Sequence, residues 1–131
     1  MEDNARRIAA EVASWEGVTA HEHRFGGVEF RVGRREIGHL HGGRWADLRF
    51  QKTVRNMLVE TGRAQPHHVL PHTGWVSTPI ADENVDDVIE LFRLAYERAR
   101  VALEVRRSRD QRGEAVGADV AAAEDHADPA V

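Results

Sequence analysis

Histidine is the side chain in this sequence that most clearly suggests chemistry. Three of the eight histidines lie in the segment "QPHHVLPHTGWVS" at residues 65–77, which also contains Trp75. Four more form two pairs with one residue between the partners, at positions 21 and 23 and at positions 39 and 41. Imidazole binds metal ions, and its unperturbed pKa of about 6.5 lets it exchange a proton near neutral pH. The histidines are therefore candidates for metal ligands, for acid–base groups, or for hydrogen-bonding groups without a reaction.

A metal site is the first alternative, and spacing argues against it. Residues two apart on a strand face the same side, so His39 and His41 can reach one ion. Asp47 or Glu36 can supply the carboxylate that zinc and iron sites usually add. However, the chain has no HExxH or comparable motif. The adjacent histidines at 67–68 are expected to point to opposite sides of an extended segment, so at most one joins a cluster. We therefore predict no metal.

Length and composition limit the remaining possibilities. A chain of 131 residues with 41% apolar and 31% charged residues is typical of one globular domain. The net charge of −4 argues against a nucleic-acid partner bound by bulk electrostatics. The absence of cysteine excludes disulfides and thiolate chemistry. We expect a cytoplasmic protein without a membrane partner, because no apolar run approaches the ~18–20 residues of a membrane span and the start lacks the apolar region of a signal peptide. The oligomeric state cannot be read from the sequence.

Hydrophobic periodicity predicts helices at both ends of a strand-rich middle. The expected order is a helix at 4–16, strands at 18–25, 28–32, 36–41 and 45–50, a helix at 51–61, a strand at 75–80 and a long helix that Asp82 caps. Short Gly-rich connections favour an antiparallel sheet. This order predicts an α+β fold of two layers, an antiparallel sheet of five to six strands with helices on one face. The domain is expected to cover residues 1–107, and residues 108–131 are expected to form a disordered tail.

Alternation along the strand at 45–50 decides which of its side chains face the core. Ala46, Leu48 and Phe50 are expected to point inward and the residues between them outward. Asp47 is therefore predicted on the solvent side. There it can form a salt bridge with a neighbouring arginine or orient a histidine. Trp75, at the start of the last strand, is either a core residue or a platform for a ligand.

Four segments together resemble a known family. They are "HRFGG" at 23–27, "GRREIGH" at 33–39, "PHHVLP" at 66–71 and "GWVS" at 74–77. The pattern, over residues 20–100, is similar to the bacterial luciferase-domain family, small proteins that resemble the core of the luciferase of bioluminescent fungi. A more distant likeness, in element order and in the histidine–tryptophan segment, is to the MmcQ/YjbR group with its CyaY-like fold.

The resemblance implies a reaction and roles for several residues. The fungal enzyme oxidises a hydroxylated pyrone with molecular oxygen, without a metal or organic cofactor. By analogy, this chain would be an oxidoreductase that needs no organic cofactor and binds a small aromatic or pyrone-like compound in a histidine-rich pocket. A histidine would remove a proton from the substrate, and the anion would react with oxygen. The base candidates are His39, His41, His67 and His68, which the sequence does not rank. Arg24 and Arg55 would stabilise the anion, Asp47 would assist binding, and Trp75 would form a wall of the pocket.

A non-enzymatic binding module is the alternative function. The MmcQ/YjbR likeness suggests nucleic acid or a protein as the partner. Arginines at 24, 31, 34, 35, 44 and 49 lie close together in the strand region and allow a local basic face despite the net negative charge. An enzyme should instead bring its histidines together beside the segment at 66–75.

Overall fold

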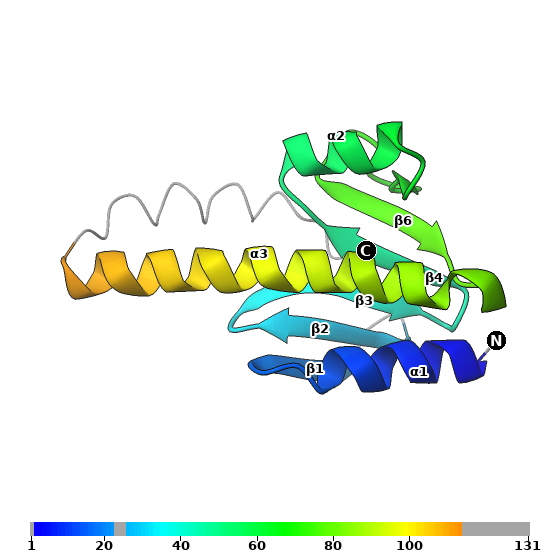
Figure 1. The fold of residues 1–131 in the computed structure, drawn as a ribbon, viewed down its shortest axis with the longest axis horizontal. Helices are drawn as coiled ribbons and strands as arrows, with labels where there is room; N and C mark the ends of the chain where they lie inside the picture. The colour runs from blue at the N-terminus through cyan, green and yellow to red at the C-terminus, as the bar shows by residue number, and fades with distance from the viewer. Residues whose placement is uncertain (1, 23–25, 114–131) are drawn as a thin grey trace.

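The computed structural model describes residues 2–22 and 26–113 of the chain. Its elements, in chain order, are α1 (Glu2–Ala13), β1 (Val18–Glu22), β2 (Val28–Val32), β3 (Arg35–His41), β4 (Trp45–Arg49), α2 (Lys52–Glu60), β5 (Gln65–Pro66), β6 (Trp75–Pro79), the 3-10 turn η1 (Asp82–Asn84) and α3 (Val85–Gln111). Figure 1 shows their arrangement. None of the helices in these ranges has an apolar stretch long enough for a bilayer.

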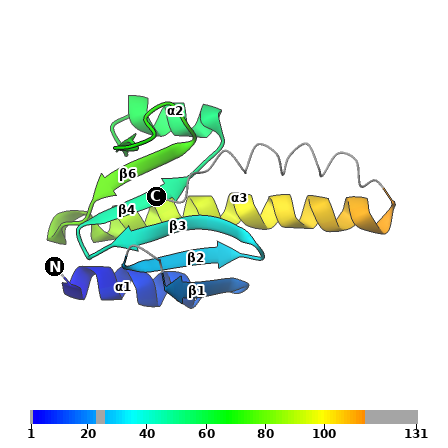
Figure 2. The same ribbon diagram turned by 180° about the vertical axis from the view of Figure 1, so that it is seen from behind.

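The strands form one sheet in the order β1-β2-β3-β4-β6-β5. Every neighbouring pair is antiparallel. Helices α1 and α3 lie on one face of the sheet, in front of it in Figure 1 and behind it when the molecule is turned in Figure 2. Helix α2 packs at the end of the sheet formed by β5 and β6. The predicted α+β architecture, with its antiparallel sheet and long C-terminal helix, is confirmed.

The core lies between the sheet and the two helices. Alternate residues of the strands face α3, as the period of two requires. Phe30 of β2 packs against Phe92 of α3, and the two rings meet edge to face with centroids 5.6 Å apart. Both side chains are fully buried, and burial of a side chain of this size contributes about 1.5–3 kcal/mol. Gly38 of β3 pairs with Phe30 on one side and with Leu48 of β4 on the other. A Cβ atom at Gly38 would be only 2.8 Å from Cε1 of Phe92.

A β-bulge in β3 changes which residues share a face. Phe30 pairs with Gly38, but the next residue of β2, Arg31, pairs with Glu36. Ile37 is therefore an extra residue in β3 and is itself buried in the core. A strand without a bulge would place residues three apart on opposite faces. The bulge brings Glu36 to the same side as His39, on the face of the sheet that points away from α3.

The ends of α3 differ from the prediction. Asp82 does not cap the helix, because a turn of 3-10 helix precedes it and α3 begins at Val85. The carboxylate of Asp82 instead accepts a hydrogen bond of 2.7 Å from Asn4 of α1. At the other end, α3 continues to Gln111, past the predicted boundary at 107, although its apolar pattern has ended. Residues 114–131 of the predicted tail lie outside the described residues.

Candidate active site

Three neighbouring strands place the polar residues of the site side by side. His39 of β3 pairs with Asp47 of β4, and Asp47 pairs with Ser77 of β6. All three side chains are buried, and that of Asp47 has no exposed surface at all. The hydroxyl of Ser77 donates a hydrogen bond of 2.6 Å to Oδ1 of Asp47. The other carboxylate oxygen, Oδ2, points toward the histidines.

Three imidazoles converge on Oδ2 of Asp47. The Nε2 atoms of His41, His39 and His67 lie 2.8, 3.2 and 3.5 Å from it. The Nε2 atoms of His39 and His41 are also only 2.9 Å apart. We refer to His39, His41, Asp47 and His67 as the His–Asp47 cluster. It gathers side chains from β3, from β4 and from the segment after β5.

Asp47 was predicted on the solvent side of β4, and that prediction is wrong. The alternation itself holds, since Ala46 and Leu48 are buried in the core on the opposite face. The segment after β5 covers the Asp47 face, however, so the carboxylate is enclosed. Its contacts in the described chain are with histidines and Ser77. The alternation of a single strand shows which residues share a face. It does not show that another segment covers the face opposite the core.

Carboxylates on both sides control the charge of His39. Its Nδ1 donates a hydrogen bond of 2.5 Å to Oε2 of Glu36, which the bulge in β3 has brought to the same face. Burial disfavours the charged imidazole, but the interactions with Asp47 and Glu36 outweigh burial and raise the pKa of His39 from 6.5 to about 9. Burial also pushes the pKa of Asp47 upward. Interactions with His39, His67 and Ser77 outweigh that effect, so the pKa of this carboxyl lies well below its usual range.

The turn after β5 fixes His67 and leaves His68 accessible. Nδ1 of His67 accepts the backbone N–H groups of Val69 and Leu70, each at 3.1 Å. A neutral imidazole with Nδ1 as acceptor carries its proton on Nε2, so His67 presents an N–H group to Asp47. His68 is exposed and stacks on His67, with ring centroids 4.4 Å apart. The two rings were expected on opposite sides, and the expectation is wrong because the chain bends here rather than remaining extended.

Trp75 forms a wall beside the cluster. Its ring centroid lies 5.5 Å from that of His39 and 6.1 Å from that of His67, and only 4% of the residue is exposed. Its Nε1 atom is buried without a hydrogen-bond partner among the described residues. The sequence allowed Trp75 to be either a core residue or part of the site. In the structure it is buried and also contacts the site.

The other predicted residues lie around the cluster or beyond it. Arg55 of α2 donates hydrogen bonds to the carbonyl oxygen of Pro71 and to Asn56. It thereby holds the 67–74 segment in place, and neither of these bonds is made to a member of the cluster. Arg24 and the neighbouring His23 lie outside the described residues. Ser77 was not predicted, although a small polar residue at a buried position of β6, opposite Asp47, is the signal that would have found it.

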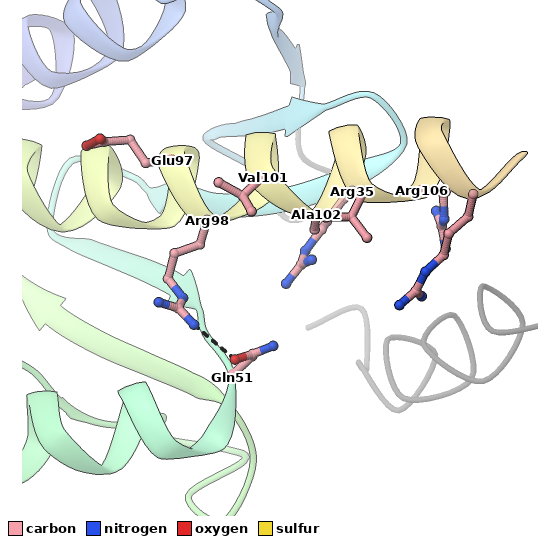
Figure 3. A pocket seen from close by; sticks show the side chains of 9 residues that line it. Arg35, Gln51, Glu97, Arg98, Val101, Ala102 and Arg106 are labelled. Carbon is pink, nitrogen blue, oxygen red and sulfur yellow. Dashed lines mark hydrogen bonds between the residues drawn. The ribbon is translucent and has the colours of Figure 1, made fainter. Parts of the chain in front are cut away.

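A separate groove of about 420 Å³ lies along α3 (Figure 3). Its lining combines arginines of α3 with Arg35 at the start of β3 and with the exposed Val101 and Val105. Arg98 donates a hydrogen bond of 2.9 Å to Gln51 across one end of the groove. The lining contains no histidine. The acid–base groups therefore point to the His–Asp47 cluster as the candidate site.

Comparison with known proteins gives one result. Residues 34–95 match the family model described as Luciferase domain. This range contains Glu36, Trp75 and all four members of the His–Asp47 cluster. No curated protein and no solved structure matches the chain. The resemblance to a luciferase-domain family is confirmed, and the likeness to the MmcQ/YjbR group finds no support.

Proposed function

Because residues 34–95 match the model of the Luciferase domain family, we propose that the protein binds a small aromatic or pyrone-like compound beside the His–Asp47 cluster and oxidises it with molecular oxygen. One observation carries the proposal. Three imidazoles meet a fully buried carboxylate next to Trp75, within the part of the chain that matches the family. Enclosed groups of this kind are costly to bury and are typical of functional sites.

Burial and hydrogen bonding rank the base candidates. His39 and His67 are each only 2% exposed, and each has a nitrogen in a hydrogen bond to the protein. His41 has a quarter of its side chain exposed, and His68 is exposed at the rim. A substrate can reach these two rings directly. His41 and His68 are therefore the proposed proton acceptors, and His39 and His67 are the proposed positioning residues.

The chemistry requires only a proton acceptor and oxygen. A histidine removes the proton from an enol or phenol hydroxyl of the substrate and becomes imidazolium. The resulting anion carries negative charge on ring carbon and forms a carbon–oxygen bond with O₂, which gives a peroxide anion. The peroxide takes the proton back from the imidazolium, so both oxygen atoms enter the product and no external reductant is needed. The buried ring of Trp75 packs against His39 and His67 and supports these two positioning residues from inside the protein.

The proposal is tested by oxygen uptake with a panel of hydroxylated 2-pyrones and phenols. The product mass should rise by two oxygen atoms. General acid–base catalysis is worth about 10²–10⁴-fold in rate, so His41→Ala and His68→Ala together should reduce turnover by at least about 100-fold. His72→Ala is the matched control, because His72 is exposed in the same segment and is not in the cluster. Equal turnover in the wild type, the double variant and His72→Ala would contradict the proposal. So would binding of a panel compound without any oxygen uptake.

A further inference from the structure

The geometry points to a metal site that the sequence did not predict: we infer that His39, His41 and Asp47 bind one divalent transition-metal ion. The inference goes beyond the proposed function, which does not require an ion. With an ion bound, Nε2 of His41 would be a ligand, and His68 alone would serve as the proton acceptor. The ligand atoms are Nε2 of both histidines and Oδ2 of the carboxylate, which lie within 3.2 Å of one another.

The distances between the three atoms match one face of a coordination shell. They are 2.8, 2.9 and 3.2 Å. Nitrogen and oxygen ligands lie about 2.1 Å from zinc and similar ions. Two such ligands at a right angle are then about 3.0 Å apart, and two at a tetrahedral angle about 3.4 Å apart. The triangle therefore fits three neighbouring corners of an octahedron, the arrangement of two histidines and one carboxylate that binds non-haem iron and leaves positions open.

The state of the Asp47 carboxylate supplies the second observation. Its Oδ2 atom is fully buried and has no hydrogen bond among the described residues, although three imidazole nitrogens lie within 3.5 Å. Burial of a carboxylate oxygen without a hydrogen bond is costly. A cation in contact with Oδ2 of Asp47 and with Nε2 of His39 and His41 would supply the missing partner.

The surrounding residues have the character of supporting groups at metal sites. Metal-binding histidines usually donate their second N–H to a carboxylate, and Glu36 accepts that bond from His39 at 2.5 Å. Ser77 binds Oδ1 of Asp47 and leaves Oδ2 for the ion. His67 is not a ligand, because Nδ1 accepts two backbone N–H groups and Nε2 must keep its proton. It lies beside the proposed ion as a hydrogen-bond donor.

Access to the site lies on the side of His41. The side chain of His41 is 25% exposed, whereas those of His39 and Asp47 are 3% and 0% exposed. The exposed ring of His68 lies next to it, with ring centroids 6.3 Å apart. The open coordination positions therefore face the rim, where a small ligand enters. An ion there would lower the pKa of a coordinated hydroxyl group.

Titration of the tag-free, chelator-treated protein with Co(II), Zn(II) and Fe(II) under anaerobic conditions tests the inference. Stoichiometry is measured by elemental analysis and Co(II) coordination by visible absorption, with no substrate present. We expect one equivalent to bind to the wild type and to His72→Ala. His41→Ala and Asp47→Asn should bind at least about 100-fold more weakly. Glu36→Gln should lose about 10–100-fold, the usual effect of a supporting residue.

Two results would overturn the metal site. One is the absence of saturable binding by the wild type with all three ions. The other is equal affinity in His41→Ala and the wild type, since a folded His41→Ala protein lacks one proposed ligand at a partly exposed position. Circular dichroism verifies the fold of each variant. The assay contains no oxidisable compound, so its outcome is separate from that of the oxygen-uptake experiment.

Discussion

Replacement of Gly38 by alanine tests how tightly α3 is packed against the centre of the sheet. The new Cβ atom would lie 2.7 Å from the carbonyl oxygen of Asp47, 2.8 Å from Cε1 of Phe92 and 3.3 Å from Cγ of Leu48. Favourable contacts between carbon atoms lie at about 3.5–4.0 Å. The backbone oxygen belongs to a paired strand and cannot move alone. The Phe92 ring cannot turn freely either, because it packs edge to face against Phe30.

The cost of Gly38→Ala follows from these contacts. Overpacking of a core by one methyl group typically costs about 1–3 kcal/mol. In a domain of about 100 residues each kcal/mol lowers the melting temperature by about 4–8 °C. We therefore expect the melting temperature to fall by roughly 5–20 °C. The displaced carbonyl belongs to Asp47, so the affinity for Co(II) should also decrease.

Urea and thermal denaturation of four proteins measure this effect. They are the wild type, Gly38→Ala, Phe92→Leu and the double variant. Leucine at 92 removes the ring atom nearest the new methyl group, so the destabilisation in the double variant should be smaller than the sum of the single effects by about 0.5 kcal/mol or more. Wild-type stability of Gly38→Ala, or strict additivity in the double variant, would refute the close approach of Phe92 to the sheet.

Two further predictions concern the residues that support the cluster. Ser77→Ala removes the only side-chain donor to Oδ1 of Asp47 among the described residues. It should destabilise the protein by about 1–3 kcal/mol, because a buried charged acceptor loses its bond. Urea denaturation measures this, and an unchanged midpoint would show that the bond contributes nothing. Arg55→Ala frees the carbonyl of Pro71. Hydrogen exchange should accelerate at residues 67–74 with little change in β4, and uniform exchange rates would contradict this assignment.

The sequence was sufficient to predict the fold because its elements have regular periods. Val28, Phe30 and Val32 alternate with polar residues in β2, and Val85, Val88 and Phe92 repeat at helical spacing in α3. Burial on one face produces these patterns directly. The start of α3 was predicted less well, because both Asp82 and Asn84 are suitable near a helix N-terminus. Their tertiary contacts distinguish them, because Asp82 accepts a hydrogen bond from Asn4 and Asn84 accepts one from the backbone of Ala81.

The site was predicted in part, and its geometry was not. Histidines at 39 and 41 share a face because they are two apart, so their proximity follows from the strand alone. The contact of Glu36 with His39 depends on the bulge at Ile37, for which the sequence contains no clear signal. The enclosure of Asp47 depends on a segment that lies about 20 residues further along the chain. Such long-range contacts cannot be deduced from local periodicity.

The His–Asp47 cluster is built partly from the sheet and partly from the connecting segment after β5. Asp47 lies on β4, which has a strand on each side, so it separates from His39 only when the sheet itself unfolds. His67 and His68 lie on a connecting segment, and motions of such segments occur in nanoseconds to microseconds. This segment is held by the hydrogen bonds of His67 to its own turn and of Arg55 to Pro71, whereas the sheet holds Asp47 and His39. We therefore expect the rates of ligand entry and release to change when these bonds are removed, without a change in the stability of the sheet.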